Sequence, residues 1–122
     1  MSEPKKTPGS IGWIDLTVDD ATGLKPFYEA VCGWTTDAYD MGECSDWVCK
    51  VDGEAIAGIC HARGPNVGIP PQWLMYVTVQ DVQRSTELVR SNGGTVLQEP
   101  AEGRPMAIVK DPAGVVFALY GA

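Results

Sequence analysis

The sequence lacks many of the features from which an activity is usually inferred. It contains a single histidine, His61, and no Cys-x-x-Cys pair among its four cysteines. It also has no glycine-rich phosphate loop, no Ser/His/Asp order and no nucleophile elbow. No apolar run approaches the roughly 20 residues of a membrane-spanning helix. We therefore expect reduced and mostly buried thiols, with a zinc site made from Cys44, Cys49 and Cys60 as an alternative.

Positive charge is scarce as well. Nine Lys and Arg stand against sixteen Asp and Glu, which gives a formal net charge of -7. Nucleic acid and anionic membranes require a basic surface, so neither is an expected partner. A cationic or neutral small organic molecule suits this surface better. Residues 1–9 are polar and hold two prolines, which argues against a signal peptide and predicts a disordered tail and a cytoplasmic location.

What is present is a strand followed by a helix. Ile14, Leu16 and Val18 alternate with Trp13, Asp15 and Thr17, which is the period of a β-strand. Asp20 is a helix-capping residue and Gly33 is a typical helix end. Between them, apolar residues at helical spacing are Leu24, Phe27, Tyr28 and Val31.

The same pattern returns 61 residues later, with Leu74 in the place of Trp13, Asp81 in that of Asp20 and Gly94 in that of Gly33. The chain is therefore interpreted as two copies of one unit of about 60 residues, each a strand, a helix and three more strands. Module one covers about residues 10–62 and module two residues 72–122. Residues 63–71, rich in Gly and Pro, form the linker, and residues 10–122 make one domain.

Three features together identify a resemblance: the two copies, the helix ending Phe27-Tyr28-Glu29 then Gly33-Trp34, and Asp111-Pro112-Ala113-Gly114 before the last strand. Their order and spacing resemble the glyoxalase/bleomycin-resistance/extradiol-dioxygenase superfamily, the vicinal oxygen chelate proteins. The resemblance implies an α+β fold in which paired βαβββ modules form a curled mixed sheet around a cavity, with helices outside. It also implies a homodimer.

The resemblance places the metal ligands of metal-dependent members on the first and last strands of each copy. In this chain those positions fall at Trp13, Leu74, Ala57 and Ala118, none of which carries a donor for a divalent ion. We therefore expect no metal at these positions and no cofactor. Metal-free members that sequester ligands are the closer comparison.

The residues that replace the ligands suggest a pocket. Aromatic walls are expected from Trp13, Tyr76, Tyr120 and Trp47, with Leu74 on the same face and space left by Ala57, Gly58 and Ala118. Such walls suit a flat or cationic molecule. The alternative is that each Trp belongs to the core.

Asp15 and His61 are the candidate acid and base. Asp15 lies on an apolar strand, where a carboxylate needs a partner, and the repeat alignment places His61 on the cavity side. The alternatives are an Asp15 that caps or pairs with a neighbour and a His61 that faces solvent at a strand end.

Three functions follow. The leading hypothesis is a metal-free small-molecule-binding protein with an aromatic and acidic cavity. The second is a metal-independent isomerase or lyase that uses Asp15 or His61. The third is a metal enzyme with unusual ligands, for example Asp15 with His61.

Overall fold

The computed structural model describes residues 7–121, which form eight β-strands, two α-helices and one short 3-10 helix. The described residues separate into two compact units, one of residues 14–73 and one of residues 7–13 with 74–121. The predicted disordered tail, residues 1–9, lies mostly outside the described residues. Within it, residues 7–9 form a turn, and the Gly9 N–H donates to the Thr78 carbonyl at 2.7 Å.

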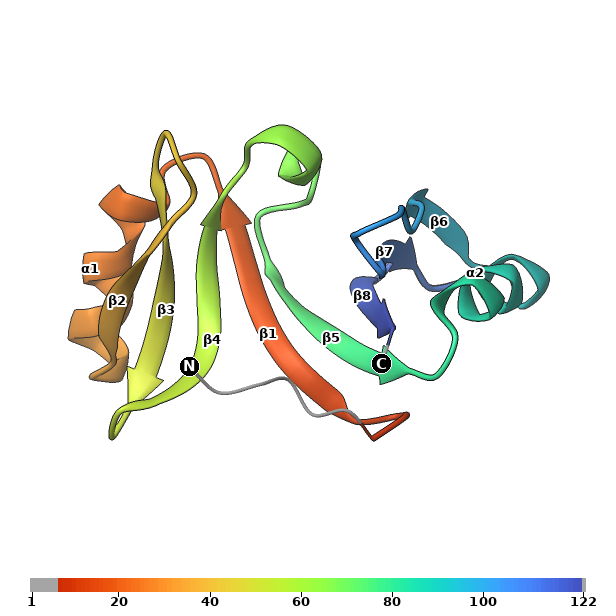
Figure 1. Cartoon of the computed structure of the whole chain (residues 1–122), viewed down its shortest axis with the longest axis horizontal. Helices are drawn as coiled ribbons and strands as arrows, with labels where there is room; N and C mark the ends of the chain where they lie inside the picture. Colours follow the sequence, from red (N-terminus) through yellow and green to blue (C-terminus); the bar gives the residue numbers. More distant parts are fainter. Residues whose placement is uncertain (1–6, 122) are drawn as a thin grey trace. The chain divides into compact units, whose positions relative to one another are not determined.

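The first unit is a four-stranded mixed sheet with one helix (Figure 1). Its strands lie in the order β2-β3-β4-β1, with β1 parallel to β4 and the other neighbours antiparallel. The elements are β1 (Ile11–Val18), α1 (Ala21–Cys32), β2 (Thr35–Asp40), β3 (Ser45–Val51), β4 (Glu54–His61) and the 3-10 helix η1 (Gly64–Asn66). The first residues of β1, up to Trp13, belong to the second unit.

The second unit has the same order of connections, β5-β8-β7-β6, with β5 parallel to β8. Its elements are β5 (Trp73–Val79), α2 (Val82–Ser91), β6 (Thr95–Gln98), β7 (Met106–Lys110) and β8 (Val116–Gly121). Of the residues in these elements, only Trp73 belongs to the first unit. The α+β class with a mixed sheet is confirmed, and each unit has the predicted order of a strand, a helix and three more strands.

Both helices begin at the predicted aspartates. The Asp20 carboxylate accepts a hydrogen bond from the Gly23 N–H at 2.9 Å, and the Asp81 carboxylate accepts one from the Arg84 N–H at 3.1 Å. Each bond satisfies a backbone donor that has no partner within the helix. Gly33 ends α1 in a left-handed conformation, with φ of 73°. Local sequence signals therefore set where the helices begin and where α1 ends.

Each helix covers one face of its own sheet. In the first unit the core under α1 consists of Ala21, Cys49, Ala57 and Ile59, with Tyr28, Trp34, Trp47 and Trp73 packed around it. In the second unit the core under α2 consists of Val82, Ala107, Val109 and Leu119. Side chains alternate along a strand, so the intervening residues lie on the face that the helix does not cover.

The helices bury less of their apolar side than their spacing suggests. Phe27 and Val31 of α1 are 56% and 65% exposed, and Leu88 of α2 is 45% exposed. In α1 the row that meets the sheet contains Ala21 and Tyr28, two turns apart, and Phe27 and Val31 lie to one side of it. In α2 the buried side chain is Thr86, which is 1% exposed and whose hydroxyl donates to the Gln83 carbonyl.

The cysteines are also less buried than expected. All four are free, but only Cys49 is buried; Cys32 is exposed, and Cys44 and Cys60 are half-buried. Cys49 lies in the core under α1, whereas Cys60 pairs with Thr17 on the other face. A zinc site made from Cys44, Cys49 and Cys60 is therefore excluded by their positions on the sheet.

The strand register corrects one step of the repeat alignment. Asp15 pairs with Gly58 in the first unit, and Tyr76, its counterpart, pairs with Ala118 in the second. Ala118 therefore corresponds to Gly58 and not to Ala57, so the last strands are related by an offset of 60 residues and not 61. Ala57 lies in the core under α1, so the expectation that it faces a cavity was wrong.

Candidate functional site

The face of the first sheet that α1 does not cover carries several polar side chains, of which Thr17 and Asp46 are buried. Register places Asp15 beside Gly58 and Thr17 beside Cys60. Val48 also pairs with Gly58, and Asp46 lies two residues before Val48 on the same strand. Because the alternate positions, Trp47 and Ile59, pack under α1, these residues share the opposite face. This face is the candidate functional site.

Cys60 lies at the centre of this site, between two carboxylates. Its thiol lies within hydrogen-bonding reach of both the Asp46 and the Asp15 carboxylates. Burial is the main cause that raises the pKa of Cys60, and the negative charges of Asp15 and Asp46 raise that pKa further. The sulfur therefore stays protonated at neutral pH and serves as a weak donor.

Asp46 has a second set of contacts, with His61. One carboxylate oxygen accepts a hydrogen bond from the backbone N–H of His61 at 2.8 Å and lies 3.4 Å from Nδ1 of the same residue. Both residues are buried, with 9% and 7% of their surface exposed. The alternative that His61 faces solvent is therefore wrong. The argument that placed it on the cavity side also fails, because it relied on Ala57 and Ile59, which lie under α1.

Cys44, in the turn that precedes β3, also lies close to Asp46 and His61. Its carbonyl accepts a hydrogen bond from the Met41 N–H at 2.8 Å, which closes the turn between β2 and β3. The donor atoms of Cys44, Asp46 and His61 lie within 4.8 Å of one another. Sequence reasoning missed Cys44 and Asp46 as partners of His61. The available signal was their alternate spacing at the start of β3, but the contact with His61 depends on the register of the β3–β4 hairpin.

Trp47 does not lie with these residues. Its indole N–H donates to the Thr22 hydroxyl at 3.0 Å, and Lys25 Nζ lies 4.6 Å from the ring centroid. Both contacts are with α1, so the expected role of Trp47 as a wall beside Asp15 is corrected. The alternative, that this Trp belongs to the core, describes it better.

The remaining predicted residues belong to the second unit. Tyr76 pairs with Ala118, and Tyr120 pairs with Thr78, on the face of the sheet that α2 does not cover. Leu74, Tyr76 and Ala118 are 2%, 9% and 0% exposed. Tyr120 is 36% exposed and Trp13 is half-buried. Of these predicted residues of the second unit, Trp13 and Tyr120 are therefore the side chains that a ligand can reach.

The residues at the family's usual metal positions do not fit a metal. Trp13 and Leu74 occupy the first-strand positions. On the last strands, the corresponding positions are Ala118 and, according to the strand register, Gly58. None of these side chains has a nitrogen or oxygen lone pair to offer a divalent ion. No chemical step is derived from a metal at these positions.

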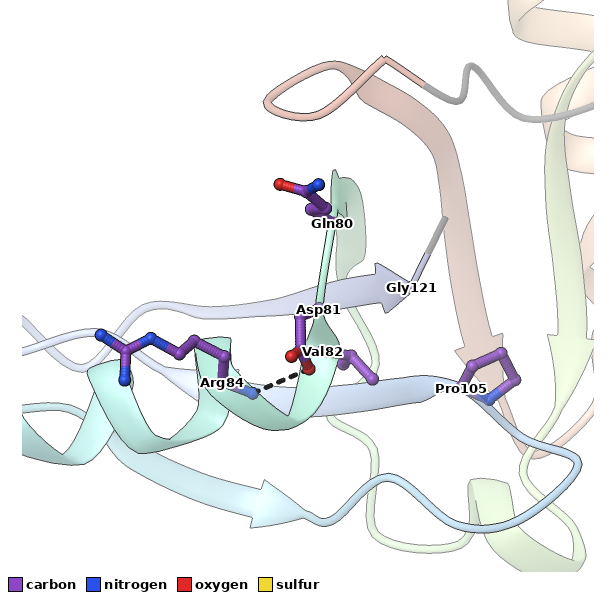
Figure 2. A pocket seen from close by; sticks show the side chains of 6 residues that line it. All are labelled: Gln80, Asp81, Val82, Arg84, Pro105 and Gly121. Carbon is purple, nitrogen blue, oxygen red and sulfur yellow. Dashed lines mark hydrogen bonds between the residues drawn. The ribbon is translucent and has the colours of Figure 1, made fainter.

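A surface groove of about 720 Å³ lies at the start of α2. Figure 2 shows its lining residues, which are Gln80, Asp81, Val82, Arg84, Pro105 and Gly121. The side chains of Gln80 and Arg84 lie well apart, and the Asp81 carboxylate is engaged in capping α2. Because its polar groups do not converge, the groove is a weaker candidate than the Asp15–Cys60–Asp46 cluster.

Comparison with known proteins identifies the family. The model of the glyoxalase-like domain matches residues 13–120. The chain belongs to the glyoxalase-like domain family. This glyoxalase-like chain is 31% identical over 130 residues to the anthracycline biosynthesis protein DnrV of Streptomyces peucetius, covering 93% of this chain and 47% of DnrV. It is 30% identical over 120 residues to CFP32 of Mycobacterium tuberculosis, which carries the provisional name of a glyoxylase, covering 93% of this chain and 46% of CFP32.

The glyoxalase-like chain thus spans about half the length of the curated relatives it matches. Solved structures agree on the fold. A hypothetical protein of Bacillus halodurans superposes with a TM-score of 0.61 at 13% identity, covering 93% of this chain and 94% of the other. Methylmalonyl-CoA epimerase of Streptomyces coelicolor superposes with a TM-score of 0.56 at 19% identity, covering 95% and 99%.

Proposed function

We propose that this glyoxalase-like chain binds a small organic molecule on the face of its first sheet opposite α1, with the half-buried Asp15 as the anionic contact. The observation that supports this proposal is the Asp15–Cys60–Asp46 cluster. It places two carboxylates around one protonated thiol on a face that its helix leaves uncovered. A net charge of -7 favours a cationic group on the ligand.

The second unit offers a contact of another kind. Trp13 and Tyr120 retain accessible aromatic surface, and ring faces attract flat or cationic groups. The proposed binding does not use the metal positions usual in the family, because the residues there carry no donors. Two of the similar proteins have names that refer to small organic molecules, namely anthracycline biosynthesis and a complex with methylmalonyl-CoA. Those names support the class of ligand and not its identity.

A second candidate is a metal-independent isomerase or lyase on the same face. It is favoured by Asp15, a half-buried carboxylate hydrogen-bonded to a thiol that retains its proton. Such a carboxylate can take a proton from a bound substrate. His61 is a weaker candidate base than Asp15, because it is buried and its ring faces Asp46.

The test is a thermal unfolding screen of the purified chain against cationic and aromatic small molecules. A ligand that binds the native state raises the unfolding temperature by mass action. For a compound that does so, we expect Asp15→Asn to weaken binding at least about tenfold, since a charge-assisted contact contributes roughly 1.5–3 kcal/mol. Asp52→Asn is the matched control, because it removes one carboxylate at an exposed turn with φ of 51°, which Asn tolerates.

The outcomes separate the two candidates. Loss of binding in Asp15→Asn with unchanged binding in Asp52→Asn supports the binding protein. Unchanged binding with loss of turnover in Asp15→Asn supports the enzyme. If no compound raises the unfolding temperature, or if Asp15→Asn alters neither binding nor turnover, both proposals are rejected.

A further inference from the structure

Three side chains of different donor type meet where the β3–β4 hairpin opens. Cys44 offers a sulfur, Asp46 a carboxylate oxygen and His61 a ring nitrogen, all within 4.8 Å of one another. We propose that Cys44, Asp46 and His61 form a binding site for a divalent transition metal, for which zinc is the best match. This site does not depend on the proposed function and lies at positions other than those of the family's usual metal ligands.

The distances are close to those that zinc requires. With zinc–ligand bonds of about 2.0–2.3 Å, tetrahedral coordination separates neighbouring donor atoms by roughly 3.3–3.6 Å. The Asp46 oxygen and His61 Nδ1 are 3.4 Å apart. The widest separation in the cluster is below 4.8 Å, so about 1 Å of contraction suffices. The half-buried Cys44 in the turn is the side chain best able to move by that amount.

The chemistry of the donors selects the class of metal. A thiolate and an imidazole are ligands for zinc and other borderline or soft ions, whereas calcium and magnesium prefer an all-oxygen shell. Three protein ligands leave one tetrahedral position open. In proteins this arrangement is typical of zinc sites that hold water or a ligand atom at the fourth position.

The surrounding contacts hold the ligands in place. The His61 backbone N–H fixes one oxygen of Asp46 at 2.8 Å, and the Cys60 thiol also hydrogen-bonds the Asp46 carboxylate. Such partners outside the ligand set orient metal-binding carboxylates. The Met41 N–H holds the Cys44 backbone through its carbonyl at 2.8 Å. The site therefore requires little rearrangement of the backbone.

The simpler alternative is that Asp46 and His61 form a structural pair and that Cys44 is a bystander. A structural pair satisfies the buried His61 ring without any metal. The two interpretations differ in whether the Cys44 sulfur bonds an added ion, which spectroscopy can measure directly.

The test uses cobalt(II) and zinc(II) with the tag-free full chain, freed of metal by dialysis against a chelator. Cobalt is titrated while the thiolate-to-cobalt charge-transfer absorption in the near ultraviolet and the visible bands of tetrahedral cobalt are recorded. We expect one equivalent of cobalt to produce both sets of bands and one equivalent of zinc to abolish them. Cys44→Ser should remove the charge-transfer band and weaken zinc binding at least about tenfold. Substituting a residue that only supports the ligands already lowers metal affinity by about tenfold or more, and Cys44 would be a ligand itself.

Cys32→Ser is the matched control, because Cys32 is exposed on α1 and outside the cluster. It should leave the bands and the zinc affinity unchanged. Asp46→Asn and His61→Gln should also weaken binding, with circular dichroism used to check that these buried variants fold. The proposal is overturned if the parent chain shows no cobalt–thiolate band, or if Cys44→Ser retains that band and the parent zinc affinity.

Discussion

Polar side chains on β3, β4 and β1 form one connected group in which each member has a partner. The Asp46 carboxylate contacts both the backbone N–H and the ring of His61. The Cys60 thiol lies within hydrogen-bonding reach of both Asp46 and Asp15. A buried or half-buried carboxylate lowers the stability of the native state unless it is hydrogen-bonded. Removing one member of the group therefore leaves another without its partner and destabilises the fold. Substitutions within this group should therefore be interpreted together with a folding control.

Glu29 provides a residue-scale prediction about pH. The Thr36 hydroxyl donates to Glu29 at 2.8 Å and is the largest cause that lowers the pKa of Glu29 below 4.5, with Lys25 adding a smaller effect. Because the pKa is lowered on folding, ionised Glu29 stabilises the native state above its unfolded pKa. That contribution is lost as the pH falls through the folded value. Thr36→Val should raise the pKa of Glu29 toward 4.5.

The measurement is an NMR titration of the Glu29 carboxyl in the parent and in Thr36→Val. Thr35→Val, at the exposed neighbouring position, is the control and should leave the titration unchanged. An identical Glu29 pKa in the parent and in Thr36→Val would show that the hydroxyl does not hold this carboxylate in solution.

At the scale of elements, the two helices differ in how they end. Gly33 ends α1 with φ of 73°, and its N–H donates to the Glu29 carbonyl at 3.1 Å. Asn92 caps the end of α2, and Gly93 follows it with φ of 89°. The next residue, Gly94, lies against the Lys110 carbonyl and Val89, where a Cβ would be only 2.7–2.8 Å from its neighbours. Gly94 is thus required for close approach, whereas Gly33 is required for its backbone angle.

Substitution of Gly33 tests this distinction. Nothing lies within 4 Å of a Cβ built at this position, so any cost arises from the backbone conformation and not from a clash. Gly33→Ala should lower the free energy of unfolding by about 1–2 kcal/mol, because L-residues disfavour positive φ. Gly33→Asn should cost less, since Asn tolerates this region. Urea denaturation of the three proteins measures the difference, and equal stability of the Ala and Asn variants would contradict the argument.

At the scale of the whole molecule, none of the helices within residues 7–121 is long and apolar enough to cross a membrane. Exposed apolar side chains are found on several elements, including Phe27 and Val31 on α1 and Tyr39 on β2. Such residues are common on surfaces and also occur where protein chains associate.

We expect the chain to form a homodimer. This expectation comes from the superfamily resemblance, which implies pairing, and a two-fold assembly is the commonest kind of homo-oligomer. Light scattering during size-exclusion chromatography should give twice the chain mass of 13.1 kDa at micromolar concentration. A mass of one chain under these conditions would contradict this expectation.

The sequence alone determined most of the elements of this fold. Alternation in β1, the aspartates that cap both helices and the glycine that ends α1 are local signals, since each depends on residues within a few positions. The superfamily resemblance then gave the α+β class. Of the residues grouped in the candidate site, Asp15 and His61 were singled out from the sequence, whereas Asp46 was not, and Cys44 was considered only with Cys49 and Cys60.

The tertiary structure decided which side chains share a face and which come together. The strand pairings show that the repeat alignment is wrong by one residue on the last strand, and in a strand one residue moves a side chain to the other face. The packing of the first unit places Ala57 and Trp47 under α1. Likewise, Asp46 meets His61 because the β3–β4 hairpin brings together residues that are 15 positions apart. Such contacts depend on strand register, which neither composition nor local periodicity specifies.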